Sequence, residues 1–179
     1  MAAAVAVPWT ISQRSAARAA AASAAVDECR AVQASADPAV PAGPMRVIAS
    51  EVRGDAVLTF AAADASPDRA VLCEHVIGNE VEGSSVGFSD ELPREAPPAG
   101  TVSVLGIGGG GANSWTGAWG YAADDVATLK VTTETGDDVE ATVTDGYWVA
   151  WWEADAGAEL TSGTARTHDG RTAAVDLRI

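Results

Sequence analysis

The second half of the chain alternates regularly between apolar and polar positions, which is the pattern of half-buried β-strands. Residues 127–132 alternate in this way, and residues 139–144 repeat the alternation. Because successive side chains of a strand point to opposite faces, each run predicts a strand with one buried face. Asp145-Gly146 then predicts a tight hairpin turn. The next run, Tyr147 to Trp152, is apolar on both faces, so we expect it to be a central strand.

Turn-forming residues recur from Met45 onward at intervals of about 8 to 12 residues, a spacing typical of sandwiches and barrels. The pattern contains no strands alternating with helices, which argues against a doubly wound fold. We therefore expect a mainly β protein, an antiparallel sandwich or barrel of about 9 to 11 short strands. The predicted hairpin turns lie at Gly54, Gly78, Gly136, Gly146 and Gly170.

An alanine-rich stretch, Ser12 to Ala34, precedes the β region and contains neither glycine nor proline. Alanine has the highest helix propensity, so this stretch predicts an N-terminal α-helix that ends by Ala36, ahead of a proline-rich segment. Val26, Cys29 and Val32 fall at helical spacing and form a stripe that can dock on the β domain. The expected organisation is an N-terminal segment, residues 1–36, followed by a β domain, residues 37–179. Within the β domain, residues 93–100 are a candidate boundary between two subassemblies.

Residues 1–11 are apolar, but the run is far shorter than the about 20 residues that cross a bilayer. It also lacks the basic region that opens a signal peptide. The run is therefore either the end of a membrane span whose upstream part is not in the sequence, or an ordinary tail. Trp9 and Arg14 follow it as interface residues follow a span, which favours the first interpretation. That interpretation predicts an extracytoplasmic protein, membrane-anchored or secreted; a cytoplasmic location is the alternative.

The charge balance excludes one class of partner. Lys and Arg total 11, Asp and Glu total 25, and the net charge is −14. Such a field repels phosphate backbones and anionic lipid surfaces, so nucleic acid is not an expected partner. Solubility is the ordinary explanation of this acidity, and a cation-binding surface is the alternative.

A serine motif, Gly83 to Gly87, matches the G-x-S-x-G pattern of hydrolases and centres on Ser85. That motif needs a sharp strand-to-helix turn, and no helical pattern follows Gly87. We therefore expect that Ser85 is not catalytic and that neither His75 nor His168 lies near it.

The sequence also gives little support for a metal site or a phosphate site. Glu74 and His75 are adjacent, so in a strand they face opposite ways and cannot chelate one ion together. Asp124-Asp125 and Asp137-Asp138 are candidates only for weak calcium binding. Gly108 to Gly111 lacks the lysine and the following helix of a phosphate loop, and it predicts a flexible hairpin or loop. No metal and no cofactor is expected.

The tryptophans are the most informative set, because the chain has six of them but only 6% aromatic residues in total. They form either a packed core or a platform for sugar rings or for a protein partner. We expect Trp119, Trp148 and Trp151 to be buried. At least one of Trp115 and Trp152 is expected to keep an exposed edge, which makes these two the candidate binding residues.

One part of the chain resembles a recurring C-terminal domain of uncharacterised actinobacterial membrane-associated proteins. The resemblance rests on Trp119-Gly120, Val126 to Leu129, Glu140 to Gly146, and Ala150-Trp151-Trp152. It implies an extracytoplasmic β domain behind one N-terminal span, and it implies no activity. The proline that usually follows the double tryptophan is replaced here by Glu153.

The two cysteines, Cys29 and Cys73, are expected to form a disulfide if the helix docks on the sheet. Two buried thiols in a cytoplasmic protein are the alternative. The sequence thus favours a non-enzymatic interaction or structural domain outside the cytoplasm, tethered by its N-terminus, with a protein or a glycan as partner. A carbohydrate or small-ligand module that uses exposed tryptophans, and a small serine hydrolase, are the alternatives.

Overall fold

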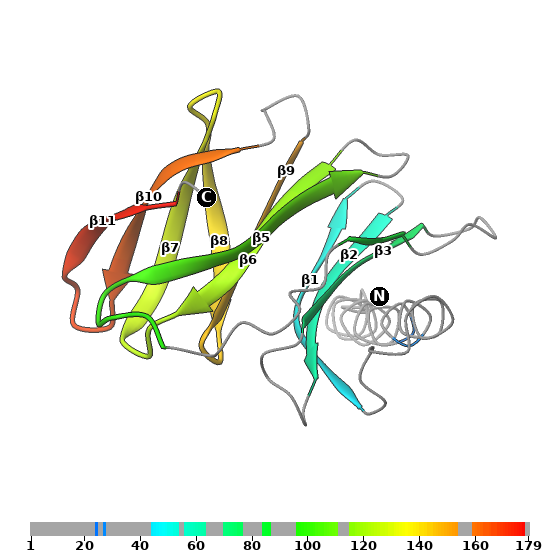
Figure 1. The fold of residues 1–179 in the computed structure, drawn as a ribbon, viewed down its shortest axis with the longest axis horizontal. Coiled ribbons are helices and arrows are strands. Elements are labelled where there is room, and N and C mark those ends of the chain that lie inside the picture. Colours follow the sequence, from blue (N-terminus) through cyan, green and yellow to red (C-terminus); the bar gives the residue numbers. More distant parts are fainter. Residues whose placement is uncertain are drawn as a thin grey trace, which may run out of the picture.

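The computed structural model describes residues 24, 27, 44–53, 56–63, 70–76, 84–86, 96–110, 115–153 and 159–177. In these ranges the protein is mainly β, and every pair of neighbouring strands is antiparallel (Figure 1), as the sequence predicts. Ala24 and Asp27 are helical. The rest of the predicted N-terminal helix lies outside the described residues.

The described strands form two sheets. The first sheet has the order β1-β2-β3-β4, and the second has the order β11-β10-β7-β8-β9-β6-β5 and curls into a half-barrel (Figure 1). The four strands of the first sheet are β1 (Met45–Arg53), β2 (Ala56–Ala63), β3 (Ala70–Val76) and β4 (Ser84–Val86). The seven strands of the second sheet are β5 (Val102–Gly110), β6 (Trp115–Ala122), β7 (Val126–Thr133), β8 (Asp138–Thr144), β9 (Tyr147–Glu153), β10 (Leu160–Thr167) and β11 (Thr172–Asp176).

Three of the predicted hairpin turns are present. Gly136, Gly146 and Gly170 have φ values of 90°, 78° and 88°. Asp145 also lies in the left-handed region, with φ 51°, so Asp145-Gly146 has the two positive φ angles of the turn that suits twisted hairpins best. The turns predicted at Gly54 and Gly78 lie outside the described residues.

Two apolar cores use the two faces of the second sheet. The common core lies between the sheets and joins β1 and β2 to β6 and β9 through Ile48, Ala49, Leu58, Phe60, Trp115, Trp119, Tyr121, Tyr147, Val149 and Trp151. The curl core is enclosed by the second sheet alone and contains Ala118, Ala122, Ala123, Val126, Leu129, Val131, Trp148, Ala150, Trp152, Leu160, Ala165, Val175 and Leu177. Because β6 and β9 lie between the two cores, both of their faces are buried. The sequence of β9, apolar on both faces, is explained by this position.

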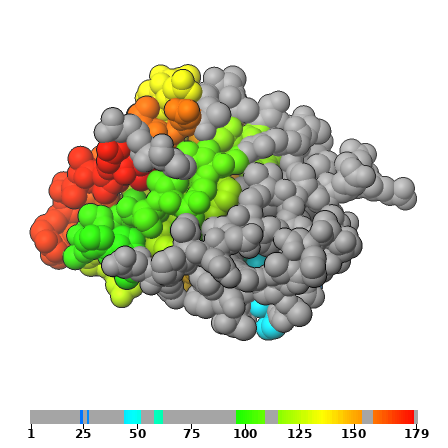
Figure 2. Space-filling model, viewed as in Figure 1, coloured from blue at the N-terminus to red at the C-terminus, as the bar shows by residue number. Residues whose placement is uncertain are grey.

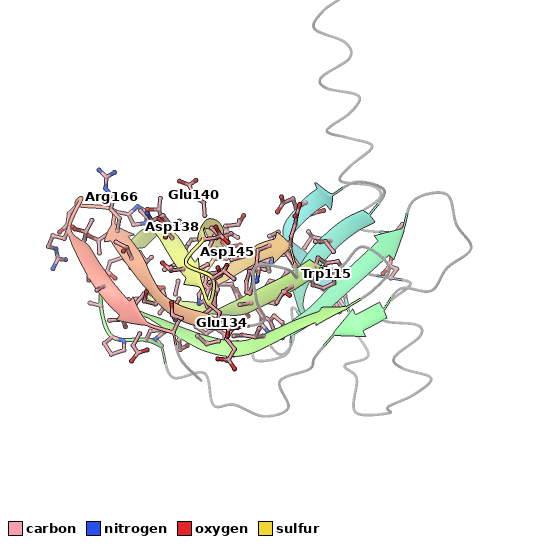
Figure 3. All side chains as sticks on the ribbon, turned by 90° about the horizontal axis from the view of Figure 1, so that it is seen from above. Trp115, Glu134, Asp138, Glu140, Asp145 and Arg166 are labelled. Atoms are coloured by element: carbon pink, nitrogen blue, oxygen red, sulfur yellow. The ribbon has the colours of Figure 1, made fainter. Side chains whose placement is uncertain are left out.

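Both edge strands of the half-barrel contribute to the curl core. Val175 of β11 is buried there, and Val102, Val104 and Ile107 of β5 pack against the same cluster. The two edges are visible on one face of the molecule, with β5 in green and β11 in red (Figure 2). On the outer surface, Glu140 and Arg166 point away from the body of the sheet (Figure 3). The curl therefore separates an apolar interior from a charged exterior.

The glycine-rich run corrects one expectation, because Gly108 to Gly110 belong to β5 and pair with β6 instead of forming a loop. Two other glycines of these strands, Gly106 and Gly117, make room for indole rings. Gly106 is the partner of Trp119, and a Cβ at Gly106 would lie 2.5 Å from that ring. Gly117 is likewise the partner of Trp151, and a Cβ there would lie 2.8 Å from its ring. Glycine here permits close approach of a large side chain.

Candidate functional site

One end of the half-barrel brings four connecting segments together: residues 98–101, 123–125, 145–146 and 168–170. We call this region the turn end. Backbone hydrogen bonds tie the segments to one another. The Ala123 amide donates to the Thr101 carbonyl at 3.1 Å, and the His168 amide donates to the Asp125 carbonyl at 2.9 Å. The Asp125 carboxylate accepts from the Gly100 amide at 2.8 Å. The turns therefore form one connected surface, although they are far apart in sequence.

A pocket of about 340 Å³ opens at the turn end. Its lining consists of residues 122–124, 126–127, 143–146 and 168. Ala122, Ala123 and Val126 are buried and give it an apolar floor. Asp124 and His168 are exposed at the rim. About half of the pocket surface is polar, whereas small-molecule sites are usually lined mostly by apolar side chains.

Ion pairs fix the charged groups around this pocket. Arg46 of β1 donates to the Asp145 carboxylate and so links the first sheet to the β8–β9 turn. Arg171 contacts Asp169 at 2.8 Å and Asp125 at 3.8 Å. Hydrogen bonds from the Thr167 hydroxyl and from Arg171 lower the pKa of Asp169 to about 2. Asp169 therefore keeps its negative charge at any physiological pH.

The tryptophans predicted to bind a ligand are not on the surface. Trp115 and Trp152 are each only 3% exposed, so the expectation that one of them keeps an exposed edge is wrong. Trp115 packs edge-on against Trp151 in the common core, with ring centroids 5.5 Å apart, and Trp152 lies in the curl core. Trp119, Trp148 and Trp151 are buried as predicted. The physical reason for the error is that the curl buries Trp152 and the common core buries Trp115, and the local sequence reveals neither.

Of the remaining predicted site residues, the described strand register brings Cys73, His75 and Ser85 into neighbouring positions. His168 lies exposed in the β10–β11 turn. Ser85 is the middle residue of β4 and the register partner of Cys73, and His75 lies in β3. Side chains in β3 and β4 lie outside the described part, as does Cys29. The expected separation of Ser85 from the histidines and the Cys29–Cys73 disulfide therefore stay predictions.

The acidic pairs take part in local hydrogen bonds. Asp138 accepts from the Lys130 ammonium at 2.6 Å and from the Thr132 hydroxyl at 3.0 Å, and these bonds lower its pKa. Asp137 accepts from the Thr135 hydroxyl at 2.7 Å. Within the described ranges, no group of three or more His, Cys, Asp or Glu side chains is arranged to hold a metal ion. In the same ranges, no helix has the length and apolar character needed to cross a membrane.

Comparison with known proteins finds no matching family model, no matching curated protein and no matching solved structure. The possible function of the turn end is therefore inferred from its geometry. Sequence reasoning missed this pocket, since its lining comes from three separate turns. The only local signal was the pairing of small residues with aspartate at Ala122 to Asp124 and at Asp145-Gly146.

Proposed function

We propose that this protein is a non-enzymatic interaction or structural domain that works outside the cytoplasm, tethered by its N-terminus. The observation that carries the proposal is the burial of all five tryptophans that the structure describes, each at most 3% exposed. The aromatic side chains stabilise the two cores, which disfavours an aromatic platform for sugars. The resemblance to extracytoplasmic actinobacterial domains and the apolar start of the chain support the compartment and the tether.

The compartment is tested by thiol labelling of intact cells that express the full-length protein. Thr164 is exposed on β10, and its neighbour Ala165 is buried. In a chain with Cys29→Ser and Cys73→Ser, Thr164→Cys is expected to react with a membrane-impermeant maleimide before cell lysis. Ala165→Cys is the matched control and is expected to stay unlabelled in the folded protein. Labelling of Thr164→Cys only after lysis would place the domain in the cytoplasm and overturn the proposal.

The turn end is the surface that we expect to contact the partner, because it combines a pocket with exposed charge. A photo-crosslinking residue in place of His168 is expected to capture a partner in cells, whereas one in place of Thr164 on the outer face is not. Asp124→Lys, at the pocket rim, is expected to reduce that capture. Glu140→Lys makes the same charge change on the outer surface and is expected to leave the capture intact. Equal capture from both positions would argue against the turn end as the interface.

A small-ligand binding module is the second candidate, and the pocket itself favours it. Its volume of about 340 Å³ lies at the lower end of the range of about 300 to 1,000 Å³ seen for small-molecule sites. A ligand at 100 times its Kd would stabilise the folded protein by about 2.7 kcal/mol, which a thermal-shift screen detects. Ala127→Phe fills the pocket and is expected to abolish the shift. Thr128→Phe, which adds the same ring to the opposite face of β7, is the control.

A further inference from the structure

The outer face of the first sheet, which is turned away from the common core, is partly covered. In β2, Leu58 and Phe60 point into the common core, whereas Thr59 and Ala61 lie on the opposite face. Thr59 and Ala61 are nevertheless 0% exposed. A side chain on an uncovered sheet face keeps part of its surface in water, so complete burial on this side requires a covering element.

The cover does not extend to β1. In an antiparallel pair, directly opposed residues share a face of the sheet. Ser50 is opposite Thr59, and Val47 is opposite Ala61. Ser50 is exposed, and Val47, at 36%, is the one large apolar side chain that is exposed among the described residues. On the outer face, the described side chains of β1 are therefore exposed to solvent, whereas those of β2 are buried.

Beyond β2, the first sheet continues with β3 and β4. Cys73 is the register partner of Thr59, and Ser85 is the register partner of Cys73. The row Thr59, Cys73, Ser85 therefore runs across three strands on one face and contains only small residues. Small residues permit another element to approach the sheet closely.

We propose that the alanine-rich segment of this chain, residues 12–36, is the element that covers this face, as a helix that lies over β2 and β3. Val26, Cys29 and Val32 are the apolar residues larger than alanine in that segment, and they fall on one side of a helix. Asp27 falls on the far side, toward solvent. The segment precedes β1 by a connection rich in proline, long enough to reverse the chain direction. Small side chains on both the helix and the sheet allow close contact. The stripe of Val26, Cys29 and Val32 determines which side of the helix faces the sheet.

The docked segment has a consequence for a tethered protein. If the N-terminus holds the chain at a membrane, any pull on the tether acts first on the contact between this helix and the first sheet. The apolar area of an alanine-rich helix is small, so the contact is expected to open more readily than either core. This inference concerns the architecture of the chain, and it stands or falls separately from the proposed compartment.

The test measures the reactivity of the Cys73 thiol in the folded, full-length chain with Cys29→Ser. Under a cover, Cys73 is expected to react with a maleimide far more slowly than in the denatured chain. Val26→Asp places a charge on the docking stripe and is expected to raise the labelling rate at least about tenfold by favouring local opening. Ala24→Asp places the same charge on the opposite side of the helix and is the matched control, with no expected change. Tryptophan emission, recorded on each variant, establishes that the two cores stay folded.

Fast labelling of Cys73 in the Cys29→Ser chain would overturn the proposal, because the face would then be open. Slow labelling that Val26→Asp and Ala24→Asp change equally, or not at all, would also overturn it, because a different segment would then be the cover. A second measurement uses oxidised glutathione, which is reduced to two thiols as the two cysteines lose their hydrogens and join. Cys29 is expected to cross-link to Cys73 but not to a cysteine one residue later, in Cys73→Ser with Glu74→Cys, since Glu74 is opposite Leu58 on the inner face.

Discussion

The two cores of this protein differ in residue composition and in the strands that they join. The common core joins two sheets and is rich in aromatic rings, with Phe60 against Trp119 and Tyr147 at centroid distances of 6.4 and 5.9 Å. The curl core belongs to one sheet and consists mostly of alanine, valine and leucine around Trp148 and Trp152. The curl core is thus internal to the half-barrel, while the common core is an interface.

The two regions depend on each other to different extents. The half-barrel encloses the curl core with its own strands, and its other face packs against the first sheet in the common core. The first sheet has only its inner face against the half-barrel, and its outer face is open at β1. We therefore expect the half-barrel to be the more stable unit and the first sheet to unfold earlier. The predictions below test that order.

The largest effect is expected from Trp148→Ala in the curl core. Trp148 is 0% exposed, and its indole N–H donates to the Ser103 carbonyl at 2.9 Å, which links β9 to β5 across β6. Loss of the ring and of this bond is expected to lower the free energy of unfolding by about 3–5 kcal/mol. Chemical denaturation followed by circular dichroism measures it. Trp148→Phe keeps part of the apolar volume and should cost less; equal costs would mean that the cavity is not the cause.

Phe60→Ala is the matched truncation in the common core. It leaves a cavity against Trp119 and Tyr147 and is expected to cost about 3 kcal/mol. The loss should appear in hydrogen exchange as faster exchange in β1 to β3, with little change in β7, β8 and β10. Phe60→Leu is the milder control. If β7 and β10 lose protection to the same extent, the two cores unfold as one unit and the comparison above is wrong.

A smaller cost is expected from Gly117→Ala, which adds one methyl group between the cores. Its Cβ would lie 2.8 Å from the Trp151 ring and 3.4 Å from the Ala150 carbonyl. The ring must shift, so we expect a loss of about 1–3 kcal/mol in stability. Trp151→Leu in the same chain should relieve the overlap. A double-mutant cycle measures this coupling, and an absence of coupling would mean that the ring does not occupy the space over Gly117.

Local patterns in the sequence predict the described strands and turns, but they do not predict which elements bury the side chains of those strands. The alternation in residues 127–132 gives β7, and Asp145-Gly146 gives the hairpin, because both depend on near neighbours. Trp152 is buried because the second sheet curls into a core of its own, which no local pattern encodes. The glycine run of β5 indicates a loop when taken alone, because its pairing with β6 is not visible in the local sequence. The pocket at the turn end was missed for the same reason, because it forms only where distant turns meet.

A cost of about 1–2 kcal/mol is expected from Gly146→Ala, because an L-residue in the left-handed region carries about that penalty. Gly146 has φ 78° and follows Asp145, which shares the turn. Thermal unfolding of the full chain measures the change. Asp145→Asn tolerates positive φ and removes only the exposed ion pair with Arg46, so it should cost less. A larger cost for Asp145→Asn would show that the ion pair between the two sheets matters more than the turn.

The smallest effect concerns Asp169 at the turn end. Its pKa is lowered to about 2, first by the hydrogen bond from the Thr167 hydroxyl and then by Arg171. The unfolded chain has an aspartate pKa of about 3.9, so the ionised side chain favours folding above that pH. This contribution is lost as the pH falls from about 4 through about 2. A carboxyl-carbon NMR titration is expected to show the low midpoint, and Thr167→Val should move it upward, toward the ordinary value. Asp124→Asn, at the pocket rim, is the control that should leave the Asp169 midpoint unchanged. A wild-type midpoint near 4 would mean that the hydrogen bonds in this turn do not persist in solution.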